Sequence, residues 1–376
     1  MKISVITLHT VNNYGSVLQT YATQKVFESL GHTTEIIDYW RADNLTEPCI
    51  DKLLAHPAMQ KSRRIWDSCS LLRKAVRIPL RHKVLNDRKS VQSFLSRHVN
   101  LSKNQYTSYE ALCENPPDAD VYVTGSDQVW NSIWNNGLDP AFFLGFAPAE
   151  KKKISFSASI GRTELDDWEL EPMRAALSSY DAISVRESSA VALLREKLGL
   201  SSTLTLDPTL MLDGDQWRAL ANTTRDMEGR YLLVYQLNRN PELDRYIEQL
   251  AQKEGLDILR LAYGNSEKKK AGRCLLRPSV EAFLGAFSNA ACVITDSFHA
   301  TSFALNMGVD FISVAPHNFG TRINSILEMT HTQHRLLRDY TDFDLCHTPV
   351  NKKEVRNILD RKRDETLTFL KNALEQ

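Results

Sequence analysis

Short apolar runs alternate with amphipathic stretches along most of the chain, which is the pattern of parallel α/β domains. The apolar run at 3–8 predicts a buried strand, and residues 33–39 predict a second one. Between them, residues 16–30 have the composition of a helix, which Gly31 is expected to end. Together these segments form one βαβ unit, whose first turn at 12–15 points toward the ligand-binding edge of the sheet.

The alternation stops between about 45 and 118, where helical stretches dominate and predict an insertion. It then resumes in two series, which Asp207-Pro208-Thr209 separates because proline removes a hydrogen-bond donor and stiffens the chain. The first series contains predicted strands at 121–124, 153–156, 182–185 and 203–206, and a helix at 187–198. The second contains predicted strands at 231–237, 257–261, 292–295 and 311–314, and helices at 241–254, 279–288 and 300–307.

These patterns predict an α/β protein with two Rossmann-like lobes, each built on a parallel sheet. The first lobe is expected to cover residues 1–210, including the helical insertion at about 45–118, and the second to cover 211–350. A charged helix is expected within 351–376. The cleft between the lobes, at the carboxyl ends of both sheets, is the expected ligand site.

Composition places the chain among ordinary soluble proteins and removes some classes of function. Hydrophobic residues make up 42% and charged residues 24%, as in globular proteins. Basic and acidic residues number 46 each, so the overall charge gives no reason to expect nucleic acid as a partner. The sequence shows neither a secretory signal nor an apolar run of membrane-spanning length, and its cysteines are scattered, which fits a reducing compartment. The predicted location is therefore cytoplasmic.

The predicted insertion carries a strong local charge. Residues 52–97 contain 12 Lys or Arg and only two acidic residues, with apolar side chains between them. Such a basic amphipathic stretch could rest on an anionic membrane surface, peripherally at the inner face, where a lipid-linked acceptor would lie. The simpler alternative is a solvated helical face that packs on the first lobe.

The string VYVTGSDQVWN at 121–131 carries an apolar strand into a cluster of polar side chains. These polar groups are costly to bury without partners, and with Trp130 they would hydrogen-bond and stack on a sugar. The alternative is a polar turn that caps the next helix. The polar members are Ser126, Asp127, Gln128 and Asn131. Asn13, in the turn after the first strand, is a further candidate at the same edge.

Two arginines and a histidine follow other predicted strands. Arg186 stands at a helix start, where a guanidinium and backbone N–H groups make an anion site, or it forms an ordinary surface pair with Glu187. His299 can donate or accept a proton near neutral pH, although such a histidine can also cap a helix or bond a buried carbonyl. Arg322, in a predicted loop at 318–322, offers a second cation to the cleft or is a solvated first-turn residue.

Several common active-site motifs do not occur in the sequence. There is no G-x-x-x-x-G-K-[ST] phosphate loop, and no G-x-G-x-x-G follows the first strand. The acidic residues form no paired metal motif. These observations disfavour kinases, ATPases and dehydrogenases, and we expect neither a metal ion nor another cofactor.

Five short strings, in this order along the chain, together resemble the polysaccharide pyruvyl transferase family. They are NYGSVLQ at 13–19, GSDQVWN at 125–131, SVRE at 184–187, LDPT at 206–209 and TDSFH at 295–299. The resemblance implies a fold like that of the B-type glycosyltransferases, with the last helix returning to the first lobe. It also implies transfer of pyruvate from phosphoenolpyruvate to two hydroxyls of a sugar in a polysaccharide or its precursor, giving a cyclic ketal and phosphate.

The resemblance also implies roles for individual residues. Arg186 matches a family arginine implicated in binding the donor, and His299 matches a histidine that serves the active site. In several members an arginine stands two residues before that histidine, whereas this chain has Ser297 there. Two explanations are open. Arg322 supplies the missing charge, with Ser297 beside it in the donor site, or the donor is not phosphoenolpyruvate. Phosphoenolpyruvate carries about three negative charges near neutral pH, so the site needs focused cations in an otherwise neutral protein.

Two other functions fit the same expected fold. A B-type glycosyltransferase would use the cleft to bind a nucleotide sugar, with arginine or histidine holding the diphosphate. A non-catalytic relative would bind a glycan without donor chemistry, and Ser297 is the feature of the sequence that points to it.

Overall fold

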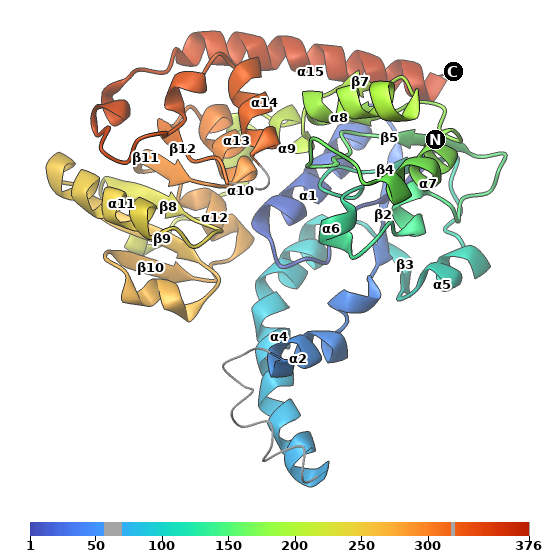
Figure 1. Ribbon diagram of the computed structural model, residues 1–376, viewed down its shortest axis with the longest axis horizontal. Coiled ribbons are helices and arrows are strands. Elements are labelled where there is room, and N and C mark those ends of the chain that lie inside the picture. The colour runs from blue at the N-terminus through green and yellow to red at the C-terminus, as the bar shows by residue number, and fades with distance from the viewer. Residues whose placement is uncertain (56–69, 317–319, 376) are drawn as a thin grey trace.

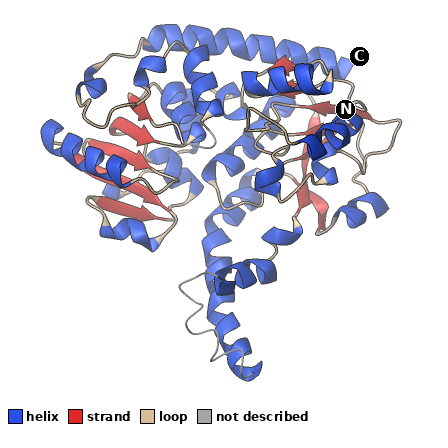
Figure 2. Cartoon of the chain, in the orientation of Figure 1, coloured by secondary structure: helices blue, strands red, loops and turns tan. Residues whose placement is uncertain are grey.

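The computed structural model describes residues 1–55, 70–316 and 320–375 of the chain. Two parallel β-sheets, each covered by helices, lie side by side (Figures 1 and 2). The first is formed by residues of the N-terminal part of the chain and the second by residues that follow Asp207. The expected architecture of two Rossmann-like lobes with parallel sheets is confirmed.

The sheet of the first lobe has the strand order β3-β2-β1-β4-β5, and all its pairings are parallel. A small parallel pair, β6 and β7, continues the sheet through single bridges from Ile154 to Ala182 and from Ala158 to Val185. The strands are β1 Lys2–Ile6, β2 Thr33–Tyr39, β3 Leu101–Tyr106, β4 Val121–Thr124, β5 Lys152–Ser155, β6 Ser184–Val185 and β7 Thr203–Leu204.

The sheet of the second lobe repeats this arrangement in the order β10-β9-β8-β11-β12. In both sheets the order reverses beside the first strand of the lobe, between β1 and β4 and between β8 and β11. Ligands of open α/β sheets bind at such a reversal, beyond the carboxyl ends of the strands. The strands are β8 Tyr231–Tyr235, β9 Asp257–Ala262, β10 Arg273–Leu276, β11 Ala290–Thr295 and β12 Phe311–Ser313.

The helices cover both faces of the sheets and connect the lobes (Figure 2). In the first lobe they are α1 Tyr14–Ser29, α2 Thr46–Ala55, α4 Ser70–His98, α5 Tyr109–Glu114, α6 Ser132–Asn135, α7 Asp167–Leu177 and α8 Ser188–Leu193, which continues as one π-helical turn at Leu194–Leu198. The remaining helices are α9 Pro208–Met211, α10 Gly214–Leu220, α11 Pro241–Glu254, α12 Val280–Gly285, α13 Phe298–Met307, α14 Thr321–Met329 and α15 Lys352–Glu375.

Two features of the sequence interpretation need correction. The predicted insertion at 45–118 contains a strand of the sheet, β3, and the short helix α5 beyond it. The strand was missed because its sequence, LSKNQY, is mostly polar, as an exposed strand at the edge of a sheet permits. Pro208 does more than end the first half, since it begins α9, where a proline at the first helical position loses no intrahelical hydrogen bond.

Helices α2 and α4 form an arm that projects from the body of the first lobe (Figure 1). Part of its positive charge is neutralised internally, because Arg77 of α4 pairs with Glu47 and Asp51 of α2. Residues 56–69 of the basic stretch 52–97 lie outside the described residues. Contact of this stretch with a membrane stays a prediction. Among the helices that the structure describes, none combines the length and apolar character needed to cross a bilayer.

Helix α15 runs across the second lobe and ends on the first (Figure 1). Near its end, the Lys152 ammonium donates to the carbonyl of Leu374 at 2.9 Å. Further back, the Thr366 hydroxyl accepts the buried N–H of Leu206 at 3.1 Å, directly after β7. The C-terminal helix therefore holds the strand that leads into the interlobe connection, as the resemblance implied.

The Thr366 hydroxyl gives a direct test of this attachment. Thr366→Val keeps the shape of the side chain but leaves the Leu206 N–H buried without an acceptor, so we expect a loss of about 1–3 kcal/mol in the free energy of unfolding. The measurement is urea unfolding followed by circular dichroism. Thr368→Val is the matched control, because Thr368 is exposed on the same helix and bonds only within it. Equal stability of the two variants would contradict the attachment.

Candidate active site

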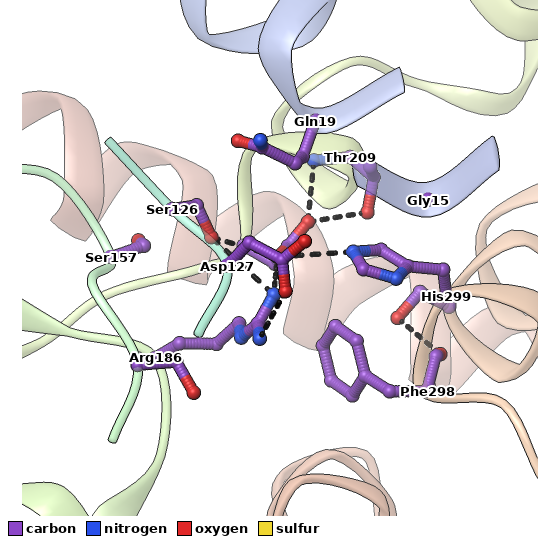
Figure 3. A network of polar contacts seen from close by, with 12 residues as sticks. Gly15, Gln19, Ser126, Asp127, Ser157, Arg186, Thr209, Phe298 and His299 are labelled. Carbon is purple, nitrogen blue, oxygen red and sulfur yellow. Dashed lines mark hydrogen bonds and ion pairs between the residues drawn. The ribbon is translucent and has the colours of Figure 1, made fainter. Parts of the chain in front are cut away.

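A buried cluster of charged residues lies where the two lobes meet (Figure 3). Three of its members follow strands of the first lobe: Asp127 comes after β4, Arg186 after β6 and Asp207 after β7. His299 comes from the second lobe, in the first turn of α13 after β11. The carboxyl ends of parallel strands share one edge of a sheet, which brings residues far apart in the sequence to this one place.

Arg186 lies at the centre of this cluster. Its Nη1 donates to Asp207 Oδ2 at 2.6 Å and to the Ser126 hydroxyl at 3.4 Å, and its Nη2 lies 3.7 Å from Asp127 Oδ1. The guanidinium carbon lies 4.7 Å from the centre of the Phe298 ring, a favourable cation–π distance. Within the described part of the chain, Nε and Nη2 have no hydrogen-bond acceptor. The arginine is therefore held in place while some of its donors remain available to an anion.

Asp207 is the carboxylate that holds Arg186. Its Oδ1 accepts the N–H of Thr209 at 2.8 Å and the Thr209 hydroxyl at 2.6 Å, which caps α9. Its Oδ2 accepts from Arg186 and from Ser126, and lies 3.8 Å from His299 Nε2. Burial by itself raises the pKa of Asp207, but the charge of Arg186, then His299 and the hydrogen bonds, outweigh burial and lower it to about 2. The carboxylate is ionised at neutral pH.

His299 is 5% exposed and enters the cluster from the opposite side (Figure 3). Its Nε2 has no hydrogen-bond partner among the described residues, apart from the more distant Asp207 carboxylate. Burial lowers the pKa of His299 to about 4, although Asp207 and Asp127 oppose that effect. The imidazole is therefore neutral at pH 7 in the protein without substrate.

Gly15 lets the two lobes approach each other at this histidine. A Cβ atom on Gly15, in the first turn of α1, would lie 2.0 Å from Nδ1 of His299, so no larger residue fits without displacing the ring. The neighbouring Tyr14 extends into the second lobe, where its N–H donates to the Tyr263 hydroxyl and its own hydroxyl donates to the Pro278 carbonyl, both at 2.8 Å. The start of α1 is thus locked against the second lobe.

Asp127 has an uncommon backbone conformation, with φ of 77°. A non-glycine residue in this region carries strain, which tends to occur at functional sites. The Ser16 hydroxyl and the N–H of Gln128 donate to its carboxylate. Burial raises the pKa of Asp127, but Arg186 and then His299 outweigh burial, and the net pKa lies below its usual value. Asp127 is thus a second buried carboxylate beside the histidine.

Three of the predicted sugar-binding residues make contacts within the protein instead: Trp130, Gln128 and Asn131. Trp130 is fully buried, donates from its indole to the Phe142 carbonyl at 3.1 Å and packs against Phe143, so a sugar cannot stack on it. Asn131 donates to the Gln128 side-chain carbonyl at 2.8 Å and caps α6. The polar turn that caps a helix, the alternative weighed for this string, describes these residues better.

The remaining candidates lie around the cluster. Asn13 caps α1 and Ser297 caps α13 with their side-chain oxygens. Arg322 lies in the first turn of α14 and not in a loop, and its guanidinium carbon is 6.0 Å from the Phe298 ring centre. Burial, followed by the charge of Arg186, lowers the pKa of Arg322 to about 10. Residues 317–319, including Asn318 of the predicted loop, lie outside the described residues.

Sequence interpretation missed the parts that organise the site. Asp207 and Gly15 appeared only within longer strings, although a carboxylate directly after a strand and a glycine opening a helix were visible signals. Glu187, read as a surface partner of Arg186, is fully buried and accepts from the N–H groups of Ile160 and Gly161. Asp296 accepts hydrogen bonds from the loop after β8, so Asp207 and not Asp296 is the carboxylate near the His299 ring.

The model of the polysaccharide pyruvyl transferase family matches residues 13–318. This span covers most of the chain and includes every residue of the cluster except Arg322. The chain belongs to this family. It is therefore a transferase, and the polar cluster at the lobe junction is its candidate active site. A search of curated protein sequences finds no significant match.

Solved structures show the same fold at low sequence identity. A UDP-GlcNAc 2-epimerase from Neisseria meningitidis bound to UDP-GlcNAc has a TM-score of 0.56 and 11% identity, over 99% of this transferase and 100% of that chain. An alpha-glucosyltransferase in complex with UDP and DNA has a TM-score of 0.50 and 10% identity, covering 98% and 95%. The N-terminal domain of trehalose-6-phosphate phosphatase from Candida albicans has a TM-score of 0.50 and 13% identity, covering 100% and 96%. The chain therefore has the expected B-type glycosyltransferase fold.

Gly15→Ala tests the contact between α1 and His299. Alanine favours helices over glycine, so on propensity alone the variant would be more stable. Because the added methyl group overlaps the imidazole, we expect instead a loss of about 1–3 kcal/mol in the free energy of unfolding. Gly264→Ala is the control, since its Cβ would meet only a serine hydroxyl at 3.5 Å. A Gly15→Ala protein as stable as wild type would disprove the close contact.

The low pKa of His299 predicts how stability depends on pH. The unfolded chain binds this proton near pH 6.5 and the folded chain only near pH 4, so the unfolded state gains more protons as the pH falls. The free energy of unfolding should therefore drop by about 2 kcal/mol between pH 7 and pH 5 through this group alone. His299→Gln removes the titration, and urea unfolding at both pH values should show a smaller drop. Parallel losses in variant and wild type would show that His299 is not buried in its neutral form.

Proposed function

We propose that the chain transfers pyruvate from phosphoenolpyruvate to two hydroxyls of one sugar, forming a cyclic ketal. The observation that carries the proposal is the convergence of two arginines from different lobes. Arg186 and Arg322 both lie at the Phe298 ring, and each has a buried guanidinium N–H without an acceptor among the described residues. Asp207 and Asp127 offset part of this positive charge, but the N–H groups that lack an acceptor favour an anion that can accept from both arginines.

The start of α14 adds to this anion site. Its N-cap, Gly320, has no side chain to accept the first N–H groups of the helix. The first N–H groups of a helix and the positive end of its dipole favour a phosphate or carboxylate at this position. Phosphoenolpyruvate carries both groups. The two arginines would bind one of these groups and the start of α14 the other. Together they would replace the positive charge that is missing at Ser297.

The reaction then needs proton transfers that the neighbouring groups are placed to perform. One sugar hydroxyl attacks C2 of phosphoenolpyruvate while the methylene carbon gains a proton and becomes the methyl group. The second hydroxyl displaces phosphate at C2, and its proton leaves with the phosphate. Both protons thus originate from the two hydroxyls, and no oxidant or reductant is required. A residue that accepts and releases a proton within the site is enough.

His299 is the residue best placed for this role. Its neutral imidazole can accept a proton from a hydroxyl, and the Asp207 carboxylate 3.8 Å away stabilises the imidazolium that results. A bound anionic donor adds negative charge near the ring and so raises the pKa of His299. The protonated ring can then act as a general acid. Asp127, ionised and buried beside it, is the second carboxylate that would face the acceptor hydroxyls.

The direct test is phosphate release from phosphoenolpyruvate with a panel of lipid-linked and nucleotide-linked sugars. We expect release that depends on the sugar, and a product of mass equal to the sugar plus a pyruvate ketal. Nucleotide formation from a nucleotide sugar, without phosphate release, would instead identify a glycosyltransferase. Sugar binding with neither reaction would identify a non-catalytic relative.

His299→Ala tests the assigned role within that assay. A catalytic histidine predicts a fall in kcat of roughly 100-fold or more with unchanged binding of phosphoenolpyruvate and a normal circular dichroism spectrum. His82→Ala, on the exposed surface of α4, is the control and should leave kcat unchanged. Near-normal turnover by a well-folded His299→Ala enzyme would end the assignment.

A further inference from the structure

A second hollow, distinct from the charged cluster, opens in the second lobe. It has a volume of about 1060 Å³ and lies beyond the carboxyl ends of β8, β11 and β12. Its lining includes Asn238 after β8, Asp296 after β11 and Val314 after β12. This is where the strand order of the second sheet reverses, the position at which open α/β sheets bind ligands. We call it the second-lobe crevice.

The second-lobe crevice is lined by elements that also carry residues of the candidate active site. Asp296, in its wall, is three residues before His299. Asn324, two residues after Arg322 on α14, lines both the crevice and a neighbouring hollow of about 640 Å³. That hollow is bounded on its other side by Arg162 and Thr163 of the first lobe. The crevice is thus lined by the same two elements, the turn between β11 and α13 and helix α14, that carry His299 and Arg322.

The charges of the crevice argue against an anionic occupant. Arg239 and Arg338 line it, but so do three carboxylates, those of Glu242, Asp296 and Glu328. Both arginines are exposed, and unlike Arg186 and Arg322 they have no buried N–H group without an acceptor among the described residues. The crevice therefore lacks the preformed anion contacts of the charged cluster.

The start of α11 in its wall is also closed to anions. Pro241 has no N–H, and the Asn240 side chain already accepts the N–H groups of Glu242 and Leu243. Helix α14, which begins at Thr321, has no side-chain cap among the described residues and is the better candidate for an anion.

The polar groups of the crevice instead suit a neutral molecule with many hydroxyls. The amides of Asn324 and Gln333 are exposed and form no side-chain hydrogen bond within the part of the chain that the structure describes. An amide offers both donors and acceptors, as paired sugar hydroxyls require. The ring of Tyr340 and the apolar side chains of Pro316 and Leu336 supply surfaces for the flat faces of sugar rings.

We infer that the second-lobe crevice binds the neutral saccharide part of the acceptor, while the charged cluster binds the donor. This assignment rests on the proposed pyruvyl transfer for its biological meaning. It moves the acceptor from the first-lobe string at 125–131 to the second lobe. The reason is that the amides of Gln128 and Asn131 already bond each other, whereas those of Asn324 and Gln333 face the hollow.

The test removes the two crevice amides together, in Asn324→Ala/Gln333→Ala. Both side chains are exposed, so the fold should tolerate the change. Neutral disaccharides and methyl glycosides of hexoses and N-acetylhexosamines are titrated into the protein without phosphoenolpyruvate and followed by NMR. We expect at least one to bind wild type and to bind the double variant at least 10-fold more weakly, since two hydrogen bonds are lost. Asn86→Ala/Gln92→Ala, an equal change on the exposed face of α4, should bind like wild type.

Other results would overturn the inference. They are the absence of saccharide binding to wild type at tens of millimolar, equal binding by the double variant, and a stronger effect of the variant on UDP than on any saccharide. The donor is measured separately, and the double variant should bind phosphoenolpyruvate as wild type does. If phosphate release fails with every sugar while saccharide binding still depends on the crevice amides, the proposed pyruvyl transfer falls and the crevice assignment stands.

Discussion

The buried ion pair between Asp207 and Arg186 is the interaction on which the rest of the site depends. Neither charge is tolerable alone in a water-free interior, so each requires the other. Asp207 is itself held by the capping bonds at Thr209, which makes the start of α9 the anchor of the arginine. The same carboxylate oxygen lies beside His299 of the other lobe. One aspartate thus sets the position of a cation and the electrostatic environment of a buried histidine.

Sequence periodicity was sufficient for most of the fold, because buried parallel strands and the helices that cover them have strong apolar patterns. It failed at β3, whose polar edge-strand sequence carries no such pattern. In the candidate site, strand ends located Arg186 and His299, since catalytic groups gather at one edge of a sheet. The residue type of Trp130 gave a misleading prediction. A tryptophan ring can stack on a sugar or pack in a hydrophobic core, and the packing in the structure shows that this ring belongs to the core. The role of Asp207 could be recognised only from its distances to Arg186 and His299 in the structure.

Neutral overall charge and a charged site are compatible because the charges are separated in space. Arg186 and Arg322 gather at one aromatic ring, Phe298, with buried N–H groups that have no acceptor among the described residues, while Arg239 and Arg338 of the second-lobe crevice are exposed. Under the proposed function, the buried guanidinium donors would select the anionic donor, and the exposed amides of the crevice would select the uncharged glycan. A protein with a uniformly basic cleft would lose that distinction.

Helix α15 returns the chain to the lobe in which it began, and its contacts at Lys152 and Leu206 fasten it there. The chain consequently crosses between the lobes twice, at α9 on the outward path and at α15 on the way back (Figure 1). The hydrogen bonds of Tyr14 to Tyr263 and Pro278 add a non-covalent attachment. A rigid body held at two points can rotate only about the line that joins them. Any separation of the lobes would thus favour a swing about the line through the two crossings, and it would have to break the Tyr14 hydrogen bonds first.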